Sequence, residues 1–236
     1  MRNSRNNKAL KIVYEDEWLI VAEKPHGLLT VSAGKPGEVT AYSLLYDYVS
    51  HSGGRIFIVH RLDRDTSGLL VFAKDEDTKI TLQENWEDAV LERRYTAVLE
   101  GKIEDDEGWI DTWLYEHPKS LKVHCYPFRQ GDDREKPPRK DWKAASSHCR
   151  TLKRYEMAGR EYTMVEFGLE TGRKNQIRVH SQWIGHPIAG DRKYGAQTDP
   201  LGRLGLHASA LSFIHPWTGK VLKFTSPLPK CFKKTD

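Results

Sequence analysis

Short apolar or alternating segments of four to eight residues recur along the chain, and they constrain its fold more than any other feature. Segments of this length and pattern are typical of β-strands. Helical spacing is limited to the segments 40–50, 76–88 and 174–184. Because these helices do not alternate regularly with the strands, the sequence predicts an α+β fold, with a large mixed, mainly antiparallel sheet flanked by a few helices and loops. The predicted strands lie near residues 11–14, 18–23, 56–59, 69–73, 95–99, 108–114, 121–126, 162–169, 206–213 and 221–225.

The length and charge of the chain favour a folded domain of generous size. With 236 residues it can bury a core without disulfides or a structural metal. Its 37 basic and 33 acidic residues leave a net charge of +4, which is too balanced for a histone-like protein. Its 7 Trp, 10 Tyr and 7 Phe are too many for a disordered chain. No internal repeat divides the sequence, so residues 1–236 are predicted to form a single domain.

Cysteine placement and hydropathy indicate the cellular compartment. Cys125, Cys149 and Cys231 form no C-x-x-C pair, which favours a reducing environment over a disulfide or zinc framework. Residues 1–8 contain no apolar stretch, and the longest purely apolar run, Leu69–Ala73, is too short to cross a membrane. The chain is therefore expected to be soluble and cytoplasmic.

Residues 129–140 form the one break in composition, because eight of these twelve residues are charged and two prolines interrupt any regular element. One interpretation is an exposed, solvated loop. The other is a finger that grips nucleic acid, since five of the charged residues are basic and three are acidic.

The segment 56–74 carries the strongest chemical signal. Two apolar runs, 56–59 and 69–73, are predicted to be strands buried on both faces. The nine residues between them, His60–Gly68, include five ionisable side chains. A loop anchored at both ends by core strands can hold polar groups in fixed positions, so a catalytic group is expected here.

The carboxylates of this loop, Asp63 and Asp65, admit three interpretations. Residues 65–68 also resemble a simple polar turn, in which side chains bond their own backbone. A pair of carboxylates could perform acid/base chemistry on a glycosidic bond, but Asp63 and Asp65 are too close in sequence to be a trusted pair. The third interpretation is a single catalytic aspartate.

The segment 170–180 enters the third predicted helix. Asn175, Arg178 and Gln182 share one polar face of that helix, and Arg178 could be an ordinary solvated arginine. Alternatively, the start of the helix, with Arg173 and Lys174 beside it, could bind a phosphate or carboxylate.

Alternation in the segment 92–101 places Tyr95, Ala97 and Leu99 on one face of a strand. Tyr95 could be an ordinary core tyrosine, or its ring could be exposed at the end of the sheet and stack on a nucleic-acid base.

Cofactor motifs are absent from the sequence. None of the ten histidines has the spacing of a known metal site, so neither a catalytic nor a structural metal is expected. The sequence contains neither G-x-G-x-x-G nor G-x-x-x-x-G-K, which disfavours a nucleotide cofactor such as NAD or ATP.

Several of these segments together resemble the RluA-type family of pseudouridine synthases. Residues 60–68, HRLDRDTSG, match the family motif H-R-L-D-x-x-T-[ST]-G, which is long and specific. Lys174-Asn175 depart from the family, which often has Ser/Thr-His there. The other matching segments are 23–28 (EKPHGL), 94–97 (RYTA), 171–180 (TGRKNQIRVH), 185–195 (GHPIAGDRKYG) and 206–208 (LHA).

The resemblance implies an isomerase of ribosomal or transfer RNA that needs no cofactor. It implies that Asp63 is the essential carboxylate and that Arg178 forms a salt bridge with it. It also implies that His60 and Arg61 take part in RNA binding and base flipping, that Arg61 fills the space left by a flipped uridine, and that Tyr95 stacks on the extruded base. Contacts from Arg173 and Lys174 to RNA phosphates are expected as well.

The resemblance further implies a catalytic domain without the S4-like domain of many members, acting as a monomer. Two alternatives to this function remain. One is a non-catalytic RNA-binding module that retains the fold, and the other is a metal-free hydrolase of glycosidic bonds, which would need a second acid opposite Asp63.

Overall fold

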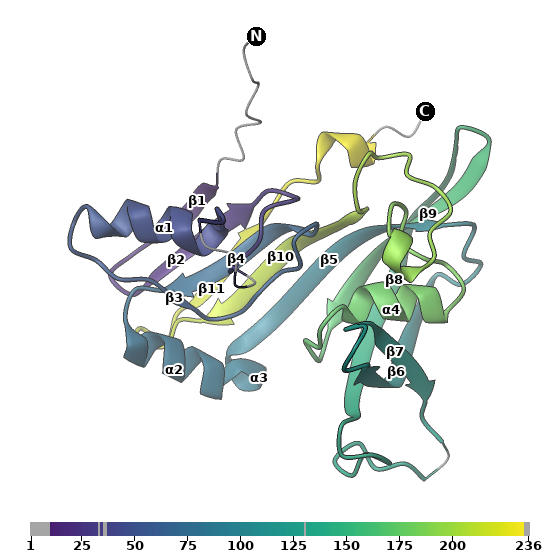
Figure 1. The fold of residues 1–236 in the computed structure, drawn as a ribbon, viewed down its shortest axis with the longest axis horizontal. Coiled ribbons are helices and arrows are strands. Elements are labelled where there is room, and N and C mark those ends of the chain that lie inside the picture. Colours follow the sequence, from purple (N-terminus) through teal and green to yellow (C-terminus); the bar gives the residue numbers. More distant parts are fainter. Residues whose placement is uncertain (1–9, 33, 35–36, 130, 234–236) are drawn as a thin grey trace. The chain divides into compact units, whose positions relative to one another are not determined.

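The computed structural model describes residues 10–32, 34, 37–129 and 131–233 (Figure 1). Its internal contacts divide these residues into two compact units. Unit 1 comprises residues up to Leu91 together with Ala208–Ser226, and unit 2 comprises Glu92–His207 together with the residues from Pro227 onward. In both units the paired strands of the sheet run antiparallel and the helices are few, which confirms the predicted α+β class.

Unit 1 is built on strands β1, β2, β4 and β10, paired in that order, with β11 paired to β10 and the short β3 paired to β4. Leu69, Val71 and Phe213 belong to its core, and β4 is buried at every position. The elements are β1 (Lys11–Glu15), β2 (Leu19–Lys24), α1 (Ala41–Ser50), β3 (Phe57–Ile58), β4 (Ser67–Ala73), α2 (Glu76–Glu84), α3 (Trp86–Ala89), β10 (Leu206–Ile214) and β11 (Val221–Thr225).

Unit 2 is an antiparallel sheet of five strands in the order β5, β9, β8, β6 and β7, with helix α4 packed against β7 and β8 (Figure 1). Ala97, Phe167 and Ile177 are in one of its core clusters. The elements are β5 (Val90–Glu100), β6 (Glu107–Glu116), β7 (Val123–Pro127), β8 (Lys143–Met157), β9 (Arg160–Leu169), α4 (Gln176–Trp183) and the 3₁₀ turns η1 (Arg192–Tyr194) and η2 (Lys230–Lys233).

Most predicted elements are present, two predictions were wrong in part, and one strand was not predicted. The segment 56–59 is not a strand buried on both faces, because β3 has two residues and both are half-buried. The helix predicted for 76–88 is interrupted at Asn85, whose side-chain amide donates to the Thr81 carbonyl at 2.8 Å and ends α2. The long strand β8 was not predicted, because its sequence is mostly polar.

Candidate active site

The segment between β3 and β4 carries Asp63 and belongs to unit 1. Its backbone turns at Asp63, whose carbonyl accepts the amide of Thr66 at 3.2 Å. Leu62 beside it is buried, Asp63 is half-buried and Arg61 is exposed. A turn is therefore present, but it spans residues 63–66 and is closed by the backbone, whereas the predicted turn at 65–68 is wrong because Ser67 and Gly68 already belong to β4. Buried Leu62 and Thr66 anchor it.

Lys24 holds this segment from the end of β2. Its side chain is fully buried, and its ammonium donates to the carbonyls of Pro25, Leu28 and Arg64 at 3.0, 2.7 and 3.0 Å. An ammonium group has three N–H donors, so these carbonyls satisfy the buried charge by themselves. Lys24 therefore ties the segment 24–28 to the loop that carries Asp63.

Thr30 holds the same loop one residue before Asp63. Its hydroxyl donates to the Leu62 carbonyl at 2.9 Å and accepts from the Leu62 amide at 3.2 Å. Both polar groups of the Leu62 backbone are thus bound to one side chain, which restrains the loop next to the carboxylate.

Gly68 explains why the family motif ends in glycine. Its φ is +114°, a conformation that side chains with a Cβ rarely adopt, and a Cβ there would lie 2.1 Å from the carbonyl oxygen of Ala208. The absence of a side chain lets the start of β4 approach β10 closely.

His60 contacts the body of unit 1. Its Nε2 accepts a hydrogen bond from the Val71 amide at 3.2 Å, and its ring lies 4.9 Å from that of Trp86, centroid to centroid. A neutral ring that accepts at Nε2 carries its proton at Nδ1. His60 therefore anchors the start of the loop to β4 and α3.

In unit 2, Arg178 of α4 forms a bidentate salt bridge with Asp191. Its Nε and Nη2 donate to the two carboxylate oxygens at 2.7 and 2.8 Å. The Arg178 side chain is 15% exposed and that of Asp191 is 1% exposed, so Arg178 is not a solvated surface arginine. Two parallel hydrogen bonds to one carboxylate fix the orientation of the guanidinium.

The aromatic ring of Tyr194 packs against the guanidinium of this ion pair. It is fully buried, and its centroid lies 5.0 Å from the Arg178 guanidinium carbon. The Tyr194 hydroxyl donates to Asn175 Oδ1 at 3.1 Å and accepts from the Val123 amide at 3.2 Å. Asp191 and Tyr194 both lie within the segment 185–195, so this segment supplies two of the contacts that hold Arg178.

Two buried residues fix α4 to the sheet. The side-chain amide of Gln176 donates through Nε2 to the Ser146 carbonyl and to Ser147 Oγ, both at 2.9 Å. The His180 ring lies between Ser147 Oγ and Thr112 Oγ1, each at 2.9 Å. Burial lowers the pKa of His180 from 6.5 to about 4, so the ring is neutral at pH 7.

Tyr95 lies on β5, opposite Phe167 of β9. It packs on the cluster that contains Ala97, Leu99 and Ile177, which confirms the predicted face of the strand. The ring is half-buried, so it is neither a fully enclosed core residue nor a free surface group.

Arg173 and Lys174 are exposed just before α4. The Arg173 Nε donates to the Ala144 carbonyl at 3.1 Å, and Lys174 forms an ion pair with Glu116. Asn175, the residue just before α4, has a left-handed conformation, and its side chain does not cap the helix. The two basic residues are therefore at the surface, and each already has one partner.

The predicted site residues belong to different units, with His60, Arg61 and Asp63 in unit 1 and Tyr95, Arg173, Lys174 and Arg178 in unit 2. Sequence reasoning missed the roles of Lys24, Thr30, Asp191 and Tyr194. Three of these lie inside segments that resembled the family, at 23–28 and 185–195, and that was the signal available for them.

Among the described residues, no three His, Cys, Asp or Glu side chains gather closely enough to hold a metal ion. No helix in the same residues is long and apolar enough to cross a membrane.

Comparison with known proteins identifies the family of this chain. The model of the RNA pseudouridylate synthase family matches residues 18–183. The RNA pseudouridine synthase YlyB of Bacillus subtilis is 37% identical over 230 residues, which cover 94% of this chain and 70% of that protein. Ribosomal large subunit pseudouridine synthase D of Nitrosomonas europaea is 36% identical over 231 residues, or 93% of this chain and 62% of that protein.

A solved structure shows the same fold. The human RNA pseudouridylate synthase domain containing 1 protein superposes with a TM-score of 0.73 at 24% identity, covering 94% of this chain and 84% of that one. Together with the family match and the sequence relatives, this identifies the chain as a member of the RluA-type RNA pseudouridine synthase family, whose enzymes isomerise uridine in RNA to pseudouridine.

Proposed function

We propose that this protein isomerises specific uridines of ribosomal or transfer RNA, with Asp63 as the essential carboxylate. The observation that carries the proposal is the rigid support of the Asp63 loop by Lys24 and Thr30. Catalytic groups need to be held close to their productive geometry, and buried hydrogen bonds to the loop backbone supply that restraint.

The proposed reaction is an isomerisation with no net change in atoms. The bond between uracil N1 and ribose C1′ breaks, the uracil turns, and a bond forms between C5 and C1′ while the C5 hydrogen leaves as a proton and N1 gains one. Asp63 either attacks C1′ or removes a ribose proton. No metal or nucleotide cofactor enters this scheme.

In either role Asp63 has to be ionised, and a nearby cation favours the ionised form of a carboxyl group. The family resemblance implies that Arg178 supplies this cation. Asp191 binds Nε and Nη2 of this guanidinium and fixes its orientation. The pairing of Arg178 with Asp63 is part of the proposal.

The proposed handling of RNA uses residues of both units. Arg61, exposed on the Asp63 loop, fills the space left by the flipped uridine, and His60 fixes the loop that presents it. Tyr95 stacks on the extruded uracil, at about 1–3 kcal/mol per base, which is comparable to the cost of flipping. Arg173 and Lys174 contact phosphates, since the surface ion pair of Lys174 is weak enough to exchange partners.

The remaining parts of the proposal concern the setting of the reaction. Ribosomal RNA is favoured as substrate by the names of relatives such as that of Nitrosomonas europaea. The protein is proposed to act in the cytoplasm as a monomer. The exposed loop at 129–140 is proposed to contribute further phosphate contacts, as its basic residues are at the surface.

Replacement of the proposed essential carboxylate tests the function. Asp63→Asn is expected to reduce turnover by roughly 10²- to 10⁴-fold or more, because the amide can neither attack nor accept a proton. The measurement is tritium release from total RNA labelled at uracil C5 and prepared from cells that lack this gene. Asp65→Asn, an exposed carboxylate of the same loop, is the matched control and should retain activity. Appreciable turnover by an Asp63→Asn preparation free of wild-type enzyme would contradict the assignment of Asp63 as the essential carboxylate.

Removal of the Arg61 side chain tests base flipping. Arg61→Ala is expected to slow modification of a uridine in a stable stem more than that of the same uridine in an unstructured strand. The reason is that unstacking costs a few kcal/mol only in the helical stem. Single-turnover rates on the two RNAs give the comparison. If both rates fall by the same factor, Arg61 has no role in flipping.

A further inference from the structure

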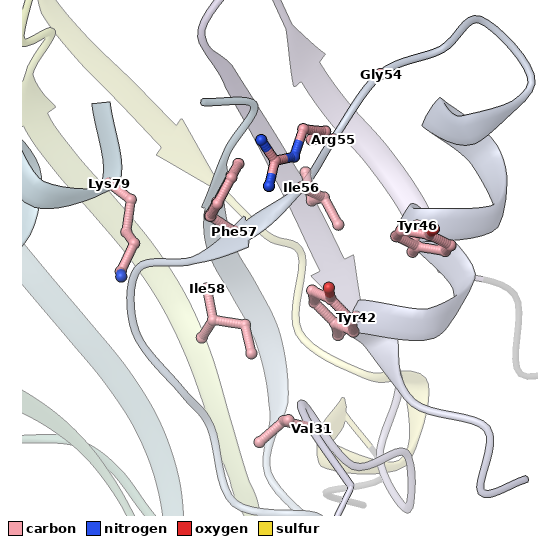
Figure 2. A pocket seen from close by; sticks show the side chains of 9 residues that line it. All are labelled: Val31, Tyr42, Tyr46, Gly54, Arg55, Ile56, Phe57, Ile58 and Lys79. Atoms are coloured by element: carbon pink, nitrogen blue, oxygen red, sulfur yellow. The ribbon is translucent and has the colours of Figure 1, made fainter. Parts of the chain in front are cut away.

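A pocket in unit 1 is lined by none of the residues assigned above to the reaction. It has a volume of about 540 Å³, and strand β3 runs through its wall (Figure 2). Figure 2 shows α1 with its tyrosines on one side of β3 and Lys79 of α2 on the other. The side chains that matter for its chemistry are Tyr42, Tyr46, Arg55, Phe57, Ile58 and Lys79.

The aromatic wall of the pocket is a pair of tyrosines one helical turn apart. The rings of Tyr42 and Tyr46 lie 6.2 Å apart, centroid to centroid, with 26° between their planes. Helix α1 buries Ala41, Leu45 and Val49 on its other face, so these rings are not needed for the core. Tyr46 remains 49% exposed, which leaves an aromatic surface open to a planar ligand.

The opposite wall is positively charged. Arg55 is exposed and its guanidinium carbon lies 5.3 Å from the centroid of the Phe57 ring, while Lys79 is half-buried on α2. Within the described part of the chain, neither cation forms an ion pair with a carboxylate, and no acidic residue lines the pocket. The pocket therefore combines open aromatic faces with two cations that form no ion pair among the described residues.

This combination matches the chemistry of single-stranded RNA. Unpaired bases stack on aromatic side chains, while basic groups of the same groove contact the phosphates. A volume of about 540 Å³ is in the range of pockets that hold one small ligand, which here corresponds to a nucleotide or two.

We propose that this pocket, which we name the α1–β3 pocket, binds an unpaired nucleotide of the RNA substrate at a place separate from the reacting uridine. A base stacks on Tyr46 and Tyr42, and Arg55 and Lys79 contact the flanking phosphates. The proposal rests on the proposed RNA-directed function and adds to it a second point of attachment, which requires an unpaired strand and not a duplex.

The test measures RNA binding directly, by fluorescence anisotropy with a labelled, unstructured 12-nucleotide RNA and a 12-base-pair duplex RNA. Tyr46→Ala is expected to weaken binding of the single strand at least about fivefold and to leave the duplex unaffected. Tyr46→Leu, which keeps the apolar cover of α1, should weaken it similarly, so a loss of folding in the first variant does not decide the outcome. Thermal unfolding checks both variants.

A charge variant tests the other wall. In Arg55→Gln/Lys79→Gln, the slope of log affinity against log salt concentration should fall in magnitude by about 1.4, which is 0.7 for each phosphate contact on a single strand. Tyr46→Ala should leave that slope unchanged. Matched controls are Tyr48→Ala, an exposed tyrosine of α1 outside the pocket whose hydroxyl donates to Glu15, and Lys220→Gln, an exposed lysine elsewhere in unit 1.

The proposal is overturned if the pocket variants bind the single strand as wild type does, or if the controls lose as much affinity. Tritium release from total RNA is measured in parallel with wild-type protein. If wild type releases tritium but the pocket variants bind normally, only this inference fails. If the pocket variants lose affinity as expected but wild type modifies no RNA, the pocket stands and the proposed synthase activity fails.

Discussion

At the residue scale, one buried carboxylate orients the guanidinium that the family resemblance connects with catalysis. The Asp191 side chain is 1% exposed and binds Arg178 through two parallel hydrogen bonds. A bidentate pair restricts the plane of the guanidinium as well as its position. Tyr194 beneath the pair excludes water from one side. We interpret Asp191 as a residue that positions Arg178.

Breaking this ion pair should be costly for stability. Asp191→Asn is expected to lower the free energy of unfolding by about 3 kcal/mol, because it removes the buried charge that binds two N–H groups of a mostly buried guanidinium. Arg178→Met combined with Asp191→Asn should cost less than the sum of the two single changes. Urea unfolding of the four proteins measures the coupling, and additive losses would contradict it. Glu116→Gln, which breaks the more exposed pair with Lys174, is the control and should cost about 1 kcal/mol or less.

The buried ring of His180 makes the stability of the protein depend on pH. Its pKa is about 4 in the folded chain, because of burial, and 6.5 is the ordinary value. Between these values the unfolded chain binds a proton that the folded chain does not, so stability falls as the pH is lowered from about 6.5 to 4. The expected loss from this residue is about 3 kcal/mol, and it does not grow further below pH 4.

Comparison of variants isolates this contribution from the titration of carboxylates. Between pH 7 and pH 4, the free energy of unfolding of His180→Asn should fall by about 3 kcal/mol less than that of wild type. His124→Asn, whose ring is exposed on β7, should follow wild type. Parallel stability curves for wild type and His180→Asn would show that the ring is not kept neutral by burial.

At the element scale, the loop between β3 and β4 is restrained by side chains from an earlier part of the chain. The acceptors of Lys24 include the Arg64 carbonyl, forty residues away in sequence. Thr30 and Leu62 are thirty-two residues apart. Position 68 adds a third restraint, because only glycine allows β4 to begin so close to Ala208. The loop is therefore rigid although its own sequence is polar.

The close approach at Gly68 predicts a large loss of stability on adding one methyl group. Gly68→Ala should lower the free energy of unfolding by on the order of 4 kcal/mol. The new Cβ would clash with the Ala208 backbone, and the positive φ at this position is strained for alanine. Gly53→Ala is the matched control, because its φ of +73° is also positive but no atom lies within 4 Å of the added Cβ. It should cost only about 1–2 kcal/mol. Equal losses in thermal or urea unfolding would contradict the close approach.

Sequence patterns predicted elements well where burial is periodic and poorly where it is not. The helix predicted over 40–50 is α1, which Thr40 caps by accepting from the Ser43 amide at 3.0 Å. Strand β8 escaped prediction because it buries only Ala145, Ser146 and Ser147 and keeps polar side chains elsewhere. Its strand conformation comes from hydrogen bonding to β6 and β9 on either side, and that pairing leaves no local sequence pattern.

At the scale of the whole molecule, the residues proposed for catalysis are divided between two compact units. Asp63 and Arg61 are in unit 1, and Arg178 and Tyr95 are in unit 2. The prediction that residues 1–236 form one domain stays a prediction, and so does the salt bridge between Asp63 and Arg178. The modest net charge of +4 is no obstacle to RNA binding, because local placement of basic residues matters more than the sum.

The sequence by itself determined the fold class, the family and the candidate catalytic residues, because these depend on local periodicity and on long specific motifs. Only the tertiary structure decided which side chains support them. Lys24, Asp191 and the serine and threonine that hold His180 were selected by packing between segments up to 68 residues apart. A buried polar group needs a partner of matching geometry, and the chain supplies that partner through folding and not through proximity in sequence.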